Sequence, residues 1–364
     1  TVLCVKVTKI VYVAMSGGVD SSVTAALLKK RGFRVVGVFM KPWSSSAEAS
    51  DGQAAFCPWK KDREDAMRVA AVLGIPLETW DFSRQYEKKV TRSMIDGYRR
   101  GITPNPDVMC NQEIKFGLFF KQAMRRGADA IATGHYARVR KSYKLQAVSY
   151  KLLKAKDRNK DQTYFLWMLT QEQLAKILFP IGEYTKPEVR TLARRFKLPT
   201  HDKKDSQGVC FVGPLDMKEF LTKHIKQKVG VVRHRDGQVL GEHDGAQYYT
   251  IGQRHGLDLG IAGGPYYVVR KNMRTNIISV GSADDLFGYQ ARLTKIRWTS
   301  GAAAELPLTV KATIRYRSEA ARAIVYKNGT LKFKKPQRAI TPGQSVVFYK
   351  GQEVLGGGII VSVA

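Results

Sequence analysis

The sequence predicts an α/β fold, in which a doubly wound parallel sheet is followed by a small β-rich domain and a C-terminal β-barrel. In the N-terminal half, short apolar runs alternate with segments of helical periodicity, which is typical of parallel strands connected by helices. Beyond Gly213, short strands separated by glycine-containing turns replace the helices, and this favours small sheets and a barrel. A chain of 364 residues is long enough for two or three domains. We expect them to span residues 1–212, 213–281 and 282–364.

The individual elements follow from the spacing of the apolar residues. Strands are predicted at Ile10–Val13, Arg34–Met40, Leu77–Phe82 and Ala128–Thr133, and later at Val229–Val232, Gln238–Leu240, Tyr248–Ile251, Tyr266–Val269, Asn276–Val280, Thr309–Tyr316 and Ser345–Tyr349. Helices are predicted at Val23–Lys30, Arg63–Leu73, Tyr86–Tyr98, Cys110–Arg126, Asp161–Leu174, Pro187–Phe196 and Met217–Ile225. The Ser/Ala/Gly-rich stretch Lys41–Trp59 predicts a long loop.

A glycine-rich turn, AMSGGVDSS at residues 14–22, connects the first predicted strand to the first predicted helix. Paired glycines let the backbone approach an anion, and the N–H groups at a helix start point toward it. The turn is not a Walker A loop, because the Gly-Lys-Ser/Thr ending is missing. It resembles the S-G-G-x-D-S-[ST] loop of the ATP pyrophosphatases, which cleave ATP between its α- and β-phosphates. The alternative is a glycine turn of an ordinary Rossmann-like unit.

The charge balance predicts a polyanionic partner. The chain has 61 Lys and Arg residues but only 31 Asp and Glu residues, which gives a formal net charge of +30. Nucleic acid is the first candidate and an anionic membrane the second, while a lineage of generally basic proteins is the alternative cause. No apolar run approaches the roughly 18 residues that a membrane-spanning helix needs. No signal peptide is visible at the N-terminus.

The four cysteines lie far apart, at Cys4, Cys57, Cys110 and Cys210, without a C-x-x-C pair. This spacing indicates neither a zinc site nor a secreted disulfide scaffold, so it predicts a reducing compartment. Cys4 is interpreted as a packing residue, and Cys57 as structural or incidental.

Two cysteines lie in unusual loops. In TPNPDVMCN, residues 103–111, two prolines stiffen the chain and Asp107 precedes Cys110 by three residues. We place this thiol at a helix start, which would lower its pKa, although an ionised Asp107 would oppose that shift. In DSQGVCF, residues 205–211, neighbouring lysines would favour the thiolate of Cys210. For each loop, the alternative is a buried, unreactive cysteine.

Further motifs follow in order: IKF (114–116), ATGHYARV (132–139), KDQTYFL (160–166), KKDSQGVCFVG (203–213), YTIGQRHGL (249–257) and IRYR (314–317). Together with the two loops above, they resemble the tRNA-specific 2-thiouridylase family over nearly the whole chain. The resemblance implies a Rossmann-like ATP-pyrophosphatase (HUP-like) catalytic domain at 1–212, a central tRNA-binding adaptor domain and a C-terminal barrel. It also implies ATP-dependent 2-thiolation of the wobble uridine of tRNA, through adenylation of uridine O2 and sulfur transfer from a cysteine persulfide.

The resemblance also implies roles for individual residues. ATP would be bound by Ala14, Met15, Ser16, Gly17, Gly18, Val19, Asp20, Ser21, Met40 and Gly134. The persulfide would form on Cys210, Cys110 would be the nucleophile that leaves a transient Cys110–Cys210 disulfide, and Asp107 would be the acid/base. The target base would contact Asn105, Pro106 and Asp107, and tRNA would contact Lys160, Asp161, Gln162, Arg315 and Tyr316. His135 is interpreted as structural.

The implied cofactors are ATP and Mg²⁺, without a metal site formed by the protein alone. The implied partners are the tRNA anticodon arm and a persulfide donor or relay protein of the cysteine desulfurase type. A monomer in the bacterial cytoplasm is expected, with the mitochondrial matrix as the alternative. Two other classes compete: a different ATP-pyrophosphatase-loop enzyme, such as an amidating or adenylating ligase of a small metabolite, and a non-catalytic RNA-binding protein. The tRNA set, the sulfur donor and the choice between a disulfide cycle and an iron–sulfur cluster stay open.

Overall fold

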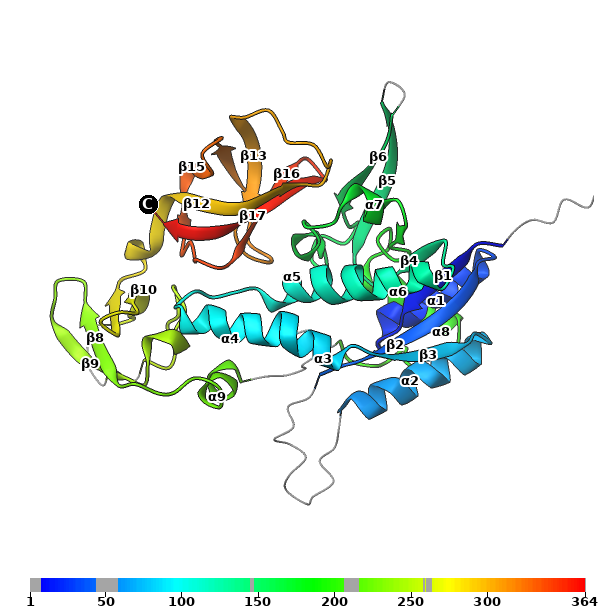
Figure 1. Cartoon of the computed structure of the whole chain (residues 1–364), viewed down its shortest axis with the longest axis horizontal. Helices are drawn as coiled ribbons and strands as arrows, with labels where there is room; N and C mark the ends of the chain where they lie inside the picture. Colours follow the sequence, from blue (N-terminus) through cyan, green and yellow to red (C-terminus); the bar gives the residue numbers. More distant parts are fainter. Residues whose placement is uncertain are drawn as a thin grey trace, which may run out of the picture.

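The computed structural model describes residues 8–43, 58–144, 147–205, 216–257, 259 and 264–363. Figure 1 shows an α/β unit (blue to green), a smaller unit (yellow-green) and a barrel (orange to red). The cyan segment around residue 100 belongs to the α/β unit. It extends from that unit toward the smaller unit and the barrel.

The α/β unit is built on a five-stranded parallel sheet, with strand order β3-β2-β1-β4-β7. Its strands are β1 (Ile10–Ala14), β2 (Arg34–Lys41), β3 (Leu77–Asp81), β4 (Ala130–Ala132) and β7 (Ile177–Leu178). Val11 of β1 pairs with Val35 on one side and Ala130 on the other. The predicted parallel sheet is confirmed.

Helices cover both faces of this sheet. They are α1 (Val19–Lys30), α2 (Pro58–Leu73), α3 (Ser83–Tyr86), α5 (Pro106–Cys110), α6 (Phe120–Arg125) and α8 (Lys186–Arg195), with the π-helical turns η2 (Glu87–Thr91) and η3 (Asn111–Phe119). Helix α4 (Arg92–Arg99) continues from η2, but its buried side chains pack with residues 220–280 of the central unit. Successive side chains of a strand point to opposite faces, so Tyr12 and Ala14 of β1 join one buried cluster, whereas Val11 and Val13 join another. Two apolar cores on one sheet confirm the doubly wound architecture.

A long hairpin that the sequence analysis does not predict projects from this unit. Strands β5 (Ala137–Lys144) and β6 (Ala147–Lys154) pair antiparallel, and Leu153 then pairs with Glu353 of the C-terminal strand β17 (Glu353–Val363). Many of the hairpin's side chains are basic or exposed, so its apolar alternation is weak. The hairpin therefore joins the α/β unit to the sheet of the C-terminal barrel.

The helix predicted over Asp161–Leu174 is wrong for most of its length. Only two short pieces are helical, η4 (Thr163–Phe165) and α7 (Gln171–Leu174). The Asp161 carboxylate accepts from the Ala155 amide (2.9 Å) and from the Thr163 hydroxyl (2.8 Å). Such side-chain bonds compete with helical hydrogen bonds, so this segment folds as an irregular, well-packed connection.

The central unit contains α9 (Met217–Thr222), a 3₁₀ turn η5 (Ala246–Tyr248) and a four-stranded sheet of order β10-β11-β8-β9. The strands are β8 (Gly230–His234), β9 (Val239–His243), β10 (Tyr267–Asn272) and β11 (Ile277–Gly281). The strand predicted at Tyr248–Ile251 is wrong, because this segment is a 3₁₀ turn followed by an irregular turn. A 3₁₀ turn η6 (Asp284–Leu286) leads from here into the barrel.

Six strands form the C-terminal barrel: β12 (Phe287–Trp298), β13 (Leu308–Thr313), β14 (Ala321–Val325), β15 (Thr330–Arg338), β16 (Ser345–Lys350) and β17. Strand β12 pairs with β15 on one edge and β17 on the other, which closes the sheet. Its interior is apolar, with Val310, Val325 and Phe348 at most 3% exposed. The predicted barrel is confirmed.

Candidate active site

The phosphate loop, residues 15–18, connects β1 to α1 at the carboxyl edge of the sheet. The Met15 amide donates to the Val38 carbonyl (2.8 Å) and holds the loop against β2. Gly17 has φ of +73°, and a Cβ at this position would lie 2.1 Å from the Asp62 carbonyl oxygen. Among the described residues, no side chain caps the start of α1. The first-turn N–H groups of α1 can therefore meet an anion.

The expected nucleotide-binding residues lie around this loop. Ser16 is exposed and Gly18 and Asp20 are half-buried, whereas Ala14, Met15, Gly17, Val19, Ser21 and Met40 are buried. Gly134 follows β4, and a Cβ there would come within 2.8 Å of the Ser21 amide nitrogen. Met40 lies near the carboxyl end of β2, beside the loop. Ligands of open α/β sheets bind at this edge.

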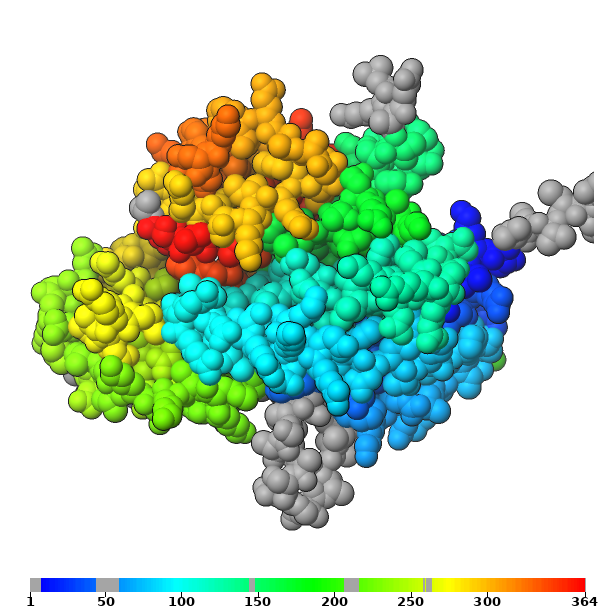
Figure 2. Space-filling view, viewed as in Figure 1, coloured from blue at the N-terminus to red at the C-terminus, as the bar shows by residue number. Residues whose placement is uncertain are grey.

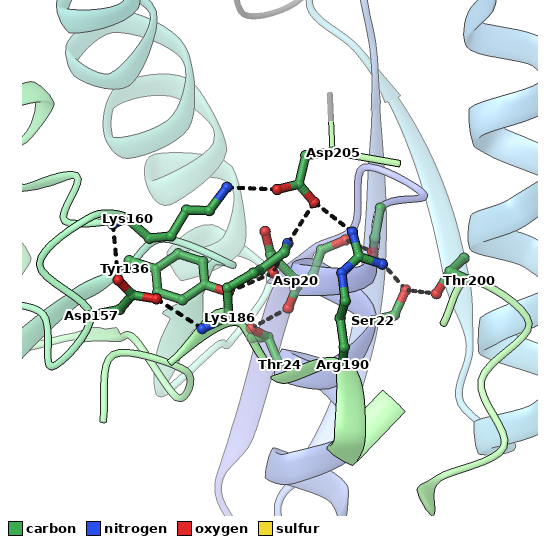
Figure 3. Close-up of polar contacts among 12 residues, drawn as sticks. Asp20, Ser22, Thr24, Tyr136, Asp157, Lys160, Lys186, Arg190, Thr200 and Asp205 are labelled. Atoms are coloured by element: carbon green, nitrogen blue, oxygen red, sulfur yellow. Dashed lines mark hydrogen bonds and ion pairs between the residues drawn. The ribbon is translucent and has the colours of Figure 1, made fainter. Parts of the chain in front are cut away.

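Five charged side chains, which we call the ion cluster, gather beside the first turn of α1: Asp20, Lys160, Lys186, Arg190 and Asp205 (Figure 3). Lys186 Nζ lies 2.7 Å from Asp20 Oδ1 and 2.9 Å from Asp205 Oδ1. Asp205 also pairs with Lys160 (2.7 Å) and Arg190 (2.9 Å). The ion cluster therefore links the phosphate loop to α8 and to the chain at Asp205.

Protonation in this region is set by burial and by these pairs. Burial alone would raise the pKa of Asp205, but hydrogen bonds from Lys160 and Lys186 outweigh it and lower the pKa to about 2. Burial raises the pKa of Tyr136, and the negative charge of Asp20 adds a smaller contribution in the same direction. The Tyr136 hydroxyl donates to Asp20 Oδ1 (2.9 Å). Burial lowers the pKa of His135 well below its ordinary value, and the positive charge of Lys115 adds a smaller contribution in the same direction. His135 is therefore neutral at pH 7, as a structural histidine would be.

The helix that we expected to begin at Cys110 begins four residues earlier. Asn105 is the N-cap of α5, its side chain accepts from the Val108 amide (3.2 Å), and Pro106 occupies the first turn. Cys110 is the last residue of α5, and η3 continues from it. The helix dipole acts mainly within the first turn. Its partial positive charge therefore lies nearer to Asp107 than to the thiol of Cys110.

The barrel clamps the loop that precedes α5. The Thr103 amide donates to the Pro342 carbonyl (2.9 Å), and the Gln344 side chain donates to the Thr103 carbonyl (2.8 Å). From the α/β unit, the Tyr164 hydroxyl donates to the Ser345 carbonyl (2.8 Å). The space-filling view shows the cyan residues in contact with their yellow and red neighbours (Figure 2). Asn105–Asp107 is thus presented at a junction of the units.

Several expected tRNA contacts are engaged within the protein. Asp161 is mostly buried, and Gln162 Oε1 accepts from the Tyr136 amide (2.9 Å). Arg315 donates to the Ala339 carbonyl (2.6 Å) and to the Thr341 hydroxyl (3.0 Å). Tyr316 packs on Phe165, with ring centroids 4.5 Å apart. Lys160 belongs to the ion cluster.

The Cys110 side chain is fully buried, in an apolar cluster that includes Ile114 and Phe116. Cys4, Cys57 and Cys210, and with Cys210 the expected Cys110–Cys210 pairing, lie outside the described residues.

Comparison with known proteins identifies the family. A family model described as "tRNA methyl transferase HUP domain" matches residues 9–214, "tRNA methyl transferase PRC-barrel domain" matches 218–282, and "Aminomethyltransferase beta-barrel domain" matches 290–360. The tRNA-specific 2-thiouridylase MnmA 2 of Geobacillus kaustophilus is 46% identical over 97% of this chain and 95% of its own length. The tRNA-specific 2-thiouridylases MnmA of Listeria monocytogenes (46%; 97% and 95%) and Shouchella clausii (45%; 96% and 96%) are equally similar. The chain belongs to the tRNA-specific 2-thiouridylase family.

The structure of this 2-thiouridylase family member also reveals site residues that sequence reasoning missed. Lys186, Arg190 and Tyr136 contact the carboxylates of the ion cluster, and Gln344 holds the loop before α5. Tyr136 lies within the ATGHYARV motif, residues 132–139, which is a signal that could have found it. Lys186 and Arg190 carry no comparable signal, because lysine and arginine are abundant along the chain.

In the part of the chain that the structure describes, no group of three or more His, Cys, Asp or Glu side chains is arranged to hold a metal ion. Within the same residues, no helix has the length and apolar character needed to cross a membrane.

Proposed function

We propose that this chain catalyses ATP-dependent 2-thiolation of the wobble uridine of tRNA. The observation that carries the proposal is about 46% identity, along 97% of the chain, to proteins named tRNA-specific 2-thiouridylases. The phosphate loop and the clamped Asn105–Asp107 segment support it, because they provide a nucleotide site and a base-contact site in one unit. We also propose that the functional domains have the boundaries expected above.

In the first step, uridine O2 attacks the α-phosphorus of ATP, so that AMP becomes attached to O2 and pyrophosphate leaves. The glycine turn and the start of α1 bind and orient the phosphates. Asn105, Pro106 and Asp107 hold the target base. The wobble base must leave its stack to reach them.

In the second step, sulfur replaces the activated oxygen. The terminal sulfur of a persulfide on Cys210 attacks uridine C2, and AMP leaves. The thiolate of Cys110 then attacks the Cys210 sulfur, which releases 2-thiouridine and forms a Cys110–Cys210 disulfide. Asp107 moves the proton that this exchange requires. An external reductant restores the thiols, and a persulfide donor supplies the next sulfur.

Mg²⁺ fits this site as an ion that arrives with ATP. Asp20 offers a carboxylate, 32% exposed, in the first turn of α1. Since Mg²⁺ in such sites is bound by one or two carboxylates together with substrate phosphates and water, one acidic residue at the loop is sufficient. When bound, the ion screens the negative charge of the triphosphate.

The tRNA is proposed to lie across the barrel, the central unit and Asn105–Asp107, with Lys160, Asp161, Gln162, Arg315 and Tyr316 forming or shaping its contact surface. We propose that the protein is a monomer. Its proposed location is the bacterial cytoplasm, with the mitochondrial matrix as the alternative.

The decisive experiment is mass spectrometry of the tRNA nucleosides after incubation with the chain, ATP, Mg²⁺ and a persulfide donor. We expect 2-thiouridine at the wobble position. We also expect that pyrophosphate release depends on a uridine-containing tRNA. Pyrophosphate release driven by a small amide donor without tRNA would instead identify a ligase. Binding of RNA without any turnover would identify a non-catalytic protein.

Replacing Asp107 with alanine is expected to lower the thiolation rate by about 10²–10⁴-fold, because a positioned proton shuttle contributes that much. Asp107→Asn preserves the shape of the side chain but cannot carry a proton, so it should be nearly as slow. Single-turnover rates at several pH values measure the effect. An Asn variant as fast as the parent would assign Asp107 a purely structural role. Asp96→Ala, on the exposed side of α4, is the matched control.

The affinity for tRNA should fall steeply as salt rises, because phosphate contacts release condensed counterions. With about six such contacts, the loss between 50 and 200 mM salt is on the order of 10³-fold. Filter binding at several salt concentrations checks this slope. A salt-independent affinity would contradict recognition through the phosphate backbone.

A further inference from the structure

We propose that Lys186 and Arg190 of α8 bind the β- and γ-phosphates of ATP and hold pyrophosphate after it leaves, and that Asp205 occupies this anion position when pyrophosphate is absent. The inference rests on the proposed function, because it assigns a binding site to the leaving group of the first step.

Three cationic side chains converge on the carboxylate of Asp205. Lys186 and Arg190 both lie 2.9 Å from Asp205 Oδ1, and Lys160 lies 2.7 Å from Oδ2. Charge-assisted donors of this kind favour oxyanions. Pyrophosphate carries more charge and more acceptor oxygens than a carboxylate, so it can satisfy the same donors more fully.

The ion cluster lies directly beside the phosphate loop. Lys186 Nζ also pairs with Asp20 Oδ1 (2.7 Å), in the first turn of the helix that follows the phosphate loop. Arg190 is four residues further along α8, so both side chains extend from one face of that helix. Figure 3 shows them reaching across the start of α1 toward Asp205. A hydrogen bond from the Thr200 hydroxyl to the Ser22 hydroxyl (3.1 Å) fixes the chain after α8 against α1.

Lys186 is a buried cation. The Lys186 side chain is only 11% exposed, and its Nζ lies 6.0 Å from the centre of the Tyr136 ring. Its backbone amide donates to the Asp157 carboxylate (2.9 Å), so the residue is held from both ends. A buried cation requires anionic partners. The Asp205 side chain is 28% exposed, so solvent reaches it, and an incoming anion can replace it while Asp20 still pairs with Lys186.

The test is the binding of inorganic pyrophosphate with Mg²⁺, measured by isothermal titration calorimetry on the full chain. Lys186→Met is expected to weaken pyrophosphate binding by about 10–100-fold, the value of a lost charge-assisted hydrogen bond, while AMP binding changes by less than about twofold. Arg190→Gln should act in the same direction. Asp205→Asn removes the competing anion and should therefore tighten pyrophosphate binding. If Asp205 leaves the anion position open in about one-tenth of the molecules, the affinity should rise by about tenfold.

Lys156→Met is the matched control, because Lys156 also pairs with a residue of α8, Glu188 (2.9 Å), at the exposed surface. This variant should bind pyrophosphate as the parent does. Unchanged pyrophosphate affinity in folded Lys186→Met would overturn the inference. If that variant fails to fold, Arg190→Gln and Asp205→Asn decide, and weaker or unchanged binding in Asp205→Asn would refute the displacement. A parent chain that does not bind pyrophosphate at all would also overturn the inference, whereas only the lack of tRNA-dependent pyrophosphate release would count against the proposed adenylation step.

Discussion

Replacing Cys110 with alanine is expected to abolish thiolation, with a loss of at least about 10³-fold, as is usual when a nucleophile is removed. Pyrophosphate release that depends on tRNA should continue, because adenylation precedes the step that needs the thiol. The side chain is fully buried beside Ile114 and Phe116, and alanine is smaller, so the fold should persist. Mass spectrometry of tRNA and a pyrophosphate assay on the same sample separate the two steps.

Cys210→Ala should give the same result, because it removes the proposed sulfur carrier. Cys4→Ala is the matched control, since it also removes one thiol but at a position interpreted as packing. Full thiolation by Cys110→Ala would eliminate the proposed role of this thiol and leave a purely structural one.

Replacing Gly17 with alanine is expected to lower ATP affinity by about 10–100-fold, the value of a lost hydrogen bond to a charged phosphate. The added Cβ would lie 2.1 Å from the Asp62 carbonyl oxygen, and φ of +73° disfavours any residue with a Cβ. The backbone of α2 cannot yield as a flexible side chain would, so the phosphate loop must move. Calorimetric titration with ATP measures the effect.

Gly32→Ala is the control for this variant. Gly32 follows the other end of α1, has φ of +83° and has no heavy atom within 4 Å of an added Cβ among the described neighbours. It should therefore cost about 1 kcal/mol of stability from backbone strain, with ATP affinity unchanged. Equal losses of ATP affinity in the two variants would show that strain, rather than collision with Asp62, limits the loop.

Much of the fold could be predicted because its signals are local. The apolar run at β1, the glycine turn and the helix after it are adjacent in the chain, and each has its own periodicity or turn chemistry. The closed barrel also follows from short alternating strands. The segment after Asp161 could not be predicted in this way, because its conformation depends on where Asp161 and Gln162 find backbone partners.

The candidate site divides in the same way. The motifs predict Ser16, Asp20 and Asp107 as site residues, since residue type and spacing carry the chemistry. The start of α5 was misplaced because Pro106 reads as a helix breaker, although in the first turn a proline costs no hydrogen bond.

By itself, the sequence determined the phosphate loop, the parallel sheet and the barrel, because each depends on residues close together in the chain. Only the tertiary structure decided that Lys186 meets Asp20 across 166 positions, that the hairpin at Leu153 pairs with Glu353, and that Gln344 holds Thr103. Contacts between residues so far apart leave no periodicity in the sequence, since they arise from packing one unit against another.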